Sequence, residues 1–357
     1  MNERSKKVLL VNSAYALSAF VLFAFALLTR LMYSIVPELA GTANEALSGE
    51  SVYGPLFSLS LVVSEFVTVA LPALLLLCFK PVRQMMKGRA WRRFNPSLWL
   101  IFPLAFGCYF AVTGLTLLWV SLLGALGLSL PEQGVPIPGG AADLLVGALV
   151  VGLFPALCEE FLFRGLMQGA YKAARPVAAI ALTGCLFALL HGQIVALPGH
   201  LFLGIALCLS VYFTRSVWAG VIFHTIHNSM ALGVSMAAQK LNELAGAALE
   251  GFETTAAELG SPQLLLSGAG FFVFFGGIAA AFFVALYFAG RHFLQRENWP
   301  LHCGANGPAA VLGLAPGEAP AAEALSPFAL LPLLPAGLIV IVNYLFSIFD
   351  ALGRPLL

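Results

Sequence analysis

Residues that can move protons or donate hydrogen bonds recur in three short clusters of an otherwise apolar chain. The clusters are Glu159, Glu160 and Arg164; Phe187 and His191; and His224, His227 and Asn228. A carboxylate and an imidazole held away from bulk water can together remove a proton from a water molecule. A second imidazole and a carboxamide can donate hydrogen bonds to the oxyanion that forms when this water attacks an amide carbonyl. The residue types therefore suit hydrolysis of an amide, and the chain has no Gly-x-Ser-x-Gly sequence that would provide a serine nucleophile.

The composition indicates that these residues belong to a membrane protein. Hydrophobic residues make up 60% of the 357 residues, charged residues only 10%, and the mean hydropathy is +0.92. Soluble domains carry about 25% charged residues, and a disordered chain is far less apolar than this one. The 18 basic and 17 acidic residues nearly cancel, and no basic stripe is large enough to follow a phosphate backbone. We therefore expect the lipid bilayer as a partner and no nucleic acid.

The apolar segments predict an all-α, polytopic transmembrane bundle. A crossing helix needs about 20 mostly apolar residues, and the segments show no period-two alternation of a membrane barrel. Nine segments fit this description: 8–29, 56–79, 97–119, 144–168, 176–196, 200–214, 217–236, 263–289 and 327–348.

The basic residues set the expected orientation. The strongest cluster is the loop 80–93, so we place this loop and the N-terminus in the cytoplasm. Nine crossings then place the C-terminus outside, in the plasma membrane if the source is bacterial. Three regions follow: 1–141 with three spans, a core of four spans at 142–236, and 237–357. The last region holds an outer loop, two further spans and an Ala/Pro/Gly-rich linker at 303–326.

The spacing of the polar residues predicts that they share one site. Glu159 lies 16 residues before Arg175 and His191 lies 16 residues after it. At about 1.5 Å rise per residue, the two arms of this helical hairpin carry both side chains to the same depth. His224 and Asn228 lie roughly 13–20 Å from the start of their own span. Three helices should therefore bring the four residues together, in a cavity reached from the cytoplasm.

Helical phase separates the roles of the two adjacent glutamates. Glu160 and Arg164 are four residues apart, the spacing at which side chains on a helix meet. We predict an internal ion pair between them, which would fix the rotation of the helix. Glu159, about 100° away, is then left to face the cavity. Glu65, in the second predicted span, has no partner that the sequence identifies.

Helical phase also predicts which of the remaining polar residues share a face of their helix. His224 and Asn228 are four residues apart and share one face, whereas His227 is turned aside by about 60°. We expect His227 to serve in packing and Phe187 to pack beside the site. His200 is expected in a short outer turn without a role.

The motifs Glu-Glu-x-x-x-Arg, Phe-x-x-x-His and His-x-x-x-Asn, in this order on successive helices, resemble the CPBP family. This family, also called Abi, includes the CAAX-type prenyl endopeptidases and the bacteriocin-processing enzymes, and the resemblance covers about 142–236. It implies an intramembrane endopeptidase in which Glu159 and His191 activate water and His224 and Asn228 hold the oxyanion. The motif residues left for structural support are Glu160, Arg164 and Phe187. The implied substrate is a peptide or protein: a prenylated CAAX-type C-terminus, or a leader or juxtamembrane segment.

Four hypotheses stay open at this point. The preferred one needs no cofactor; the second makes Glu159, His191 and His224 ligands of Zn²⁺ with an open fourth position. CPBP proteins have been described in both ways, and the absence of His-Glu-x-x-His favours the metal-free form. Buried Glu and His also build proton relays, so a proton-coupled transporter is the third hypothesis, although the chain shows no paired halves. The fourth is a non-catalytic membrane scaffold. The sequence does not indicate an oligomeric state.

Overall fold

The computed structural model describes residues 1–35, 53–87, 96–128, 136–171, 176–245, 261–296 and 325–351. Within these ranges the regular structure is helical, without a strand, which confirms the predicted all-α class. Part of the basic loop (88–93), the turn 172–175 and most of the predicted linker (303–324) lie outside the described residues.

Several predicted spans consist of consecutive helical segments that change their winding. The second span comprises α3 (Pro55–Glu65), the π-helix η1 (Phe66–Ala70), α4 (Leu71–Leu75) and the 3₁₀-helix η2 (Leu76–Cys78). The fourth comprises α7 (Ala141–Gly147), η5 (Ala148–Leu153), α8 (Phe154–Glu160), η6 (Phe161–Met167) and α9 (Gln168–Tyr171), in which η5 and η6 are π-helices. The other elements are α1 (Glu3–Ile35), α5 (Lys80–Lys87), η4 (Pro96–Leu100), α6 (Ile101–Ala125), α10 (Pro176–Leu190), α11 (Leu197–Thr214), α12 (Val217–Ala245), α14 (Pro262–Arg296), η8 (Pro327–Leu330) and α16 (Leu333–Ala351).

Seven helical segments in the described part of the chain are long and apolar enough to cross a bilayer, against nine predicted spans. The predicted span 176–196 differs because α10 ends at Leu190, where Gly192 adopts a left-handed φ of 63°, a common way to end a helix. Its 15 residues reach about 22 Å, short of the ~30 Å hydrocarbon layer. The predicted span 217–236 lies in α12, which is long enough, but polar residues such as His224 and Asn228 lower its hydropathy.

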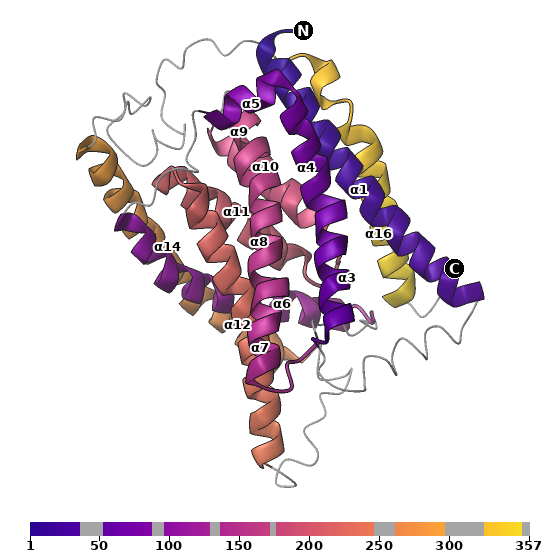
Figure 1. Cartoon of the computed structure of the whole chain (residues 1–357). Coiled ribbons are helices and arrows are strands. Elements are labelled where there is room, and N and C mark those ends of the chain that lie inside the picture. Colours follow the sequence, from indigo (N-terminus) through magenta and orange to yellow (C-terminus); the bar gives the residue numbers. More distant parts are fainter. Residues whose placement is uncertain are drawn as a thin grey trace.

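The first and last helices, α1 and α16, lie side by side along one edge of the bundle, and α6 packs against α14 at the opposite edge (Figure 1). The backbone N–H of Ser326 donates to Ser5 Oγ near the start of both segments (3.0 Å). Near their other ends, the Arg30 guanidinium lies 4.9 Å from the Phe346 ring centroid, and Phe23 contacts the same ring. The two helices are therefore parallel.

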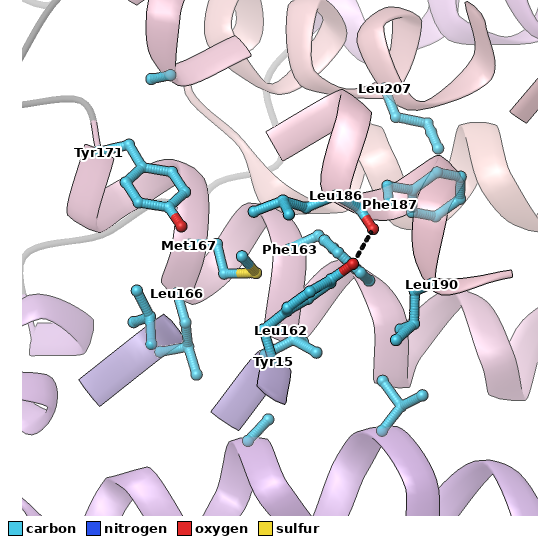
Figure 2. Close-up of a cluster of buried hydrophobic side chains, with 14 of the residues drawn as sticks. Tyr15, Leu162, Phe163, Leu166, Met167, Tyr171, Leu186, Phe187, Leu190 and Leu207 are labelled. Atoms are coloured by element: carbon cyan, nitrogen blue, oxygen red, sulfur yellow. Dashed lines mark hydrogen bonds between the residues drawn. The ribbon is translucent and has the colours of Figure 1, made fainter. Parts of the chain in front are cut away.

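The α1 helix also packs against η6 and α9 and is bonded to α10 (Figure 2). The buried Tyr15 hydroxyl donates a hydrogen bond to the Leu186 carbonyl of α10 (3.0 Å). One turn earlier, Asn12 Nδ2 donates to the Ala329 carbonyl of η8 (2.7 Å), and its Oδ1 accepts from the Tyr171 hydroxyl of α9. Asn12 therefore joins three segments that are remote in sequence.

Replacing Asn12 should destabilise the bundle. In Asn12→Ala, the buried Ala329 carbonyl and Tyr171 hydroxyl both lose a hydrogen-bond partner, and we expect the free energy of unfolding to fall by about 1–3 kcal/mol. Unfolding of the purified protein in mixed micelles measures the change. Ser13→Ala is the matched control, because the exposed Ser13 hydroxyl bonds only to its own helix at Leu9. Equal stability of the two variants would contradict this role of Asn12.

Candidate active site

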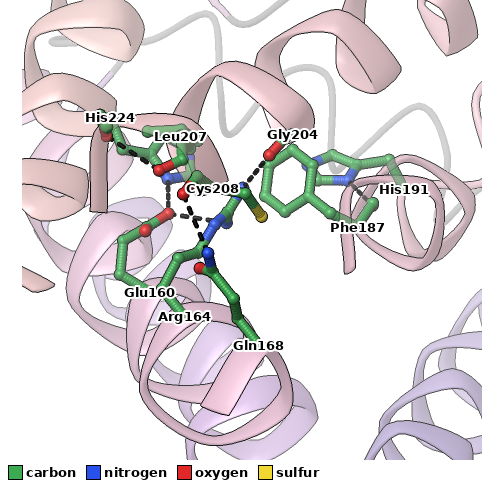
Figure 3. A network of polar contacts seen from close by, with 10 residues as sticks. Glu160, Arg164, Gln168, Phe187, His191, Gly204, Leu207, Cys208 and His224 are labelled. Atoms are coloured by element: carbon green, nitrogen blue, oxygen red, sulfur yellow. Dashed lines mark hydrogen bonds and ion pairs between the residues drawn. The ribbon is translucent and has the colours of Figure 1, made fainter. Parts of the chain in front are cut away.

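The centre of the polar region is the carboxylate of Glu160. Arg164 Nη1 donates to Glu160 Oε1 at 2.8 Å, and both side chains are fully buried, so the predicted ion pair is present. It forms although the chain changes from α8 to the π-helical η6 between the two residues. The same oxygen lies 3.2 Å from His224 Nδ1 of α12 (Figure 3), an interhelical contact that the sequence did not predict.

The Arg164 guanidinium makes two further contacts that stabilise its buried charge. Its Nη2 donates to the Gly204 carbonyl of α11 (3.0 Å), and its Cζ lies 4.5 Å from the centroid of the Phe187 ring. The Gly204 position requires glycine, because a Cβ there would lie 2.8 Å from the Gly184 carbonyl oxygen of α10. The close approach of α10 and α11 therefore belongs to the support of Arg164.

The ring of His191 is oriented by its own helix. Its Nδ1 lies 2.9 Å from the Phe187 carbonyl. Because a carbonyl oxygen can only accept, Nδ1 carries a hydrogen, and Nε2 of the neutral ring is left as an acceptor. Phe187 itself is fully buried and contacts the rings of both His191 and His224, with centroids 4.8 and 5.7 Å apart. Phe187 thus packs between groups of different helices, as expected.

The turn that follows His191 (191–196) is held by helices outside the three polar clusters. Since α10 is too short to cross, irregular backbone at this depth needs partners for its polar groups. Trp119 Nε1 of α6 donates to the Ile194 carbonyl (2.8 Å). The single hydroxyl hydrogen of Ser347 in α16 is shared between the Gly192 carbonyl (3.4 Å) and the Asn343 carbonyl of its own helix (3.2 Å). One span that precedes the three polar clusters in the sequence and one that follows them therefore contribute to the position of His191.

Glu159 is buried in a different way from its neighbour. Its side chain is 8% exposed, and Oε2 accepts no hydrogen bond from any described residue. It interacts electrostatically with Glu160, Arg164 and Glu65. No hydrogen bond joins it to His191 in the described structure. An oxygen of Glu159 is therefore available to accept a hydrogen bond from a bound molecule.

The remaining residues of α12 take different positions. Asn228 Nδ2 donates to the Val151 carbonyl of η5 (3.1 Å), which leaves its second amide hydrogen available. The His227 ring packs against Tyr109 of α6, with centroids 5.4 Å apart, and its buried Nδ1 makes no hydrogen bond with the described residues. His227 thus has the packing position that the helical phase predicted.

Two residues that sequence reasoning left aside lie near this site. Glu65 interacts electrostatically with Glu159 and His224, and its buried Oε1 accepts no hydrogen bond from the described chain. The His200 ring lies against the His191 ring, with centroids 4.1 Å apart. Sequence alone gave one signal for Glu65, an acidic residue at membrane depth. No comparable signal marked His200.

A zinc site would require Glu159, His191 and His224 to converge on one ion. Glu159, His191 and His224 keep one unused oxygen or ring nitrogen each. However, no group of three His, Cys, Asp or Glu side chains in the described ranges is arranged to hold a metal ion. In the described ranges these three side chains therefore do not fit a zinc ion.

All three polar clusters fall within a segment that resembles known proteins. Residues 141–230 match the family model described as type II CAAX prenyl endopeptidase, Rce1-like. We call residues 141–230 the Rce1-like segment. The match confirms the resemblance to CPBP-family intramembrane proteases and supports a hydrolase that acts in a membrane. Glu65, Trp119 and Ser347 lie outside the Rce1-like segment, which covers about a quarter of the chain. No match was found among curated proteins or among solved structures.

Gly220 of α12 should be essential to the network, because a Cβ at this position would overlap Glu160 Oε2. We expect Gly220→Ala to lower the free energy of unfolding by about 1–3 kcal/mol through overpacking. Gly233, on the same helix, faces open space, so Gly233→Ala should leave stability unchanged or raise it by up to about 1 kcal/mol. Unfolding in mixed micelles compares the two variants. A tolerated Gly220→Ala would contradict the described position of Glu160.

Proposed function

We propose that the protein is an intramembrane endopeptidase that cleaves a membrane-associated peptide with water activated by Glu159 and His191. One observation carries this proposal: the buried Glu159 carboxylate lies beside the Arg164–Glu160–His224 network without taking part in its hydrogen bonds, and its Oε2 accepts none from the described residues. A carboxylate buried only for structure would be expected to accept hydrogen bonds from its neighbours. The Rce1-like match supports the same class of reaction.

The first chemical step is attack by water. A water molecule donates one hydrogen to Glu159 Oε2 and the other to His191 Nε2. The lone pair of Nε2 is free because Nδ1 carries the ring hydrogen and donates it to the Phe187 carbonyl. As the water oxygen bonds to the carbonyl carbon, its proton passes to Glu159 and the carbonyl π electrons move to oxygen. Since Glu159 and His191 share no direct hydrogen bond, the water is the group that links them.

The resulting oxyanion needs hydrogen-bond donors. Asn228 offers the amide hydrogen that Val151 does not use. His224 presents Nδ1 to Glu160, and because a carboxylate only accepts, Nδ1 carries the hydrogen. Nε2 then donates to the oxyanion when the ring carries a hydrogen on both nitrogens. Collapse of the oxyanion breaks the C–N bond, and Glu159 returns its proton to the leaving amine.

The substrate we propose is the C-terminal region of a prenylated CAAX-type protein, since this is the class named for the matched family. A leader or juxtamembrane peptide is the second candidate from the sequence resemblance. We place the N-terminus and the access to the site on the cytoplasmic side, on the basis of the basic residues of loop 80–93.

The function is tested by removing the carboxylate of Glu159 while keeping its shape. In proteoliposomes, we expect Glu159→Gln to cleave an internally quenched, farnesylated CAAX peptide at least ~100-fold more slowly and to unfold like the unmodified protein. Asp143→Asn is the matched control, because Asp143 bonds to the Gly139 backbone and should leave the rate unchanged. Undiminished cleavage by Glu159→Gln would exclude the proposed mechanism.

Two variations of the same assay separate the alternatives. The unmodified protein, freed of metal by a strong chelator and checked by elemental analysis, is expected to retain its rate; loss of activity that Zn²⁺ restores would favour the metal-dependent mechanism. The peptide without its farnesyl group is expected to be cleaved more slowly, whereas equal rates would favour a leader or juxtamembrane substrate.

A further inference from the structure

His200 lies in the first turn of α11, where it contacts the ring of His191. The two ring centroids are 4.1 Å apart and the planes are tilted by 32° relative to each other, so the rings are in close contact. This is the shortest ring-to-ring distance that His191 makes, since Phe187 is at 4.8 Å. The His191 ring therefore has neighbours on its own helix and on the next one.

The backbone that carries His200 is fixed by α6. The Trp119 indole donates to the Ile194 carbonyl just before α11 begins. At Gly199, a Cβ would lie 2.7 Å from Thr116 Oγ1, so the first turn of α11 packs directly on α6. A ring attached to this turn can restrain its neighbour, because its own position is held by a separate helix.

In its buried position, His200 has one ring nitrogen without a hydrogen bond to the described residues. Its Nδ1 is buried and forms no hydrogen bond with the described residues, which is unfavourable unless the ring has a use there. Electrostatic interactions of His200 reach His191, His224 and His227. The ring thus belongs to the same cluster as two of the proposed catalytic residues.

His191 has one orientation that serves the proposed reaction. The hydrogen bond from Nδ1 to the Phe187 carbonyl fixes which nitrogen is free, but a single bond leaves the ring plane able to tilt. A flat ring packed at a centroid distance of 4.1 Å opposes further rotation of the His191 ring. Small displacements matter here, since a misplacement of about 1 Å costs on the order of 100-fold in rate.

We propose that His200 is a positioning residue, whose ring packs against the His191 ring and holds Nε2 of His191 toward the reacting water. This inference rests on the proposed function for its catalytic consequence. The ring contact itself does not depend on that function, and neither does the orientation of His191 that follows from it.

The test compares His200→Ala, which removes the ring, with His200→Phe, which keeps a flat ring without nitrogen. With the farnesylated quenched peptide, we expect His200→Ala to lower kcat by about 10–100-fold with little change in KM. His200→Phe should restore most of the lost kcat. Equal kcat in His200→Ala and the unmodified protein would overturn the proposal, as would a His200→Phe variant that is as slow as His200→Ala.

A second measurement needs no cleavage. In ¹⁵N spectra of histidine-labelled protein, assigned by loss of the signal in His191→Gln, we expect one sharp Nδ1–H form of His191 in the unmodified protein and in His200→Phe. His200→Ala should show an exchange-broadened or mixed-tautomer signal. An unchanged His191 signal in His200→Ala would overturn the proposal, even if the unmodified protein cleaved neither peptide and the proposed function failed.

Discussion

Glu160 Oε1 accepts hydrogen bonds from two different helical segments. The side chains of Glu160 and Arg164 are fully buried. Ionisable groups at membrane depth each cost roughly 2.5–3.5 kcal/mol on insertion scales, so none can stay unpaired cheaply. The Glu160 carboxylate meets this constraint by joining Arg164 to His224. The neighbouring helices accommodate this network. Gly220 of α12 has no side chain that would overlap Glu160, and the Gly204 carbonyl of α11 accepts a hydrogen bond from Arg164. The second oxygens of Glu159 and Glu160 both accept no hydrogen bond from the described residues; the two carboxylates differ in that Glu160 also pairs with Arg164.

The helices outside the Rce1-like segment explain how an irregular turn persists beside this network. A turn at membrane depth exposes carbonyl groups that lipid cannot satisfy. Trp119 of α6 and Ser347 of α16 donate to the turn after His191, and Tyr15 of α1 donates to α10 just before it. The flanking spans therefore do more than surround the core, because they supply donors that the matched segment does not contain. The N- and C-terminal regions therefore help to hold the turn after His191 in place, a role that their apolar sequences did not indicate.

The sequence was informative where a feature depends on one helix and less so where it depends on packing. The all-α class followed from composition, and the Glu160–Arg164 pair followed from four-residue spacing. The contact of Glu160 with His224 joins residues 64 apart in sequence, and helical phase cannot predict it. The fifth span was extended too far, because apolar residues continue past Gly192, where the backbone turns. The π-helical segments beside Glu65 and Glu160 leave no sequence pattern, although such segments are frequent at functional sites.

The most direct test of this account is the coupling energy between Glu160 and His224. A double-mutant cycle with Glu160→Gln, His224→Phe and the double variant, followed by unfolding in mixed micelles, isolates that energy from the cost of each substitution. We predict a non-additive coupling of about 1–3 kcal/mol, as found for residues in one buried polar network. Strict additivity, within about 0.3–0.5 kcal/mol, would show that the carboxylate does not hold His224 and would contradict the account.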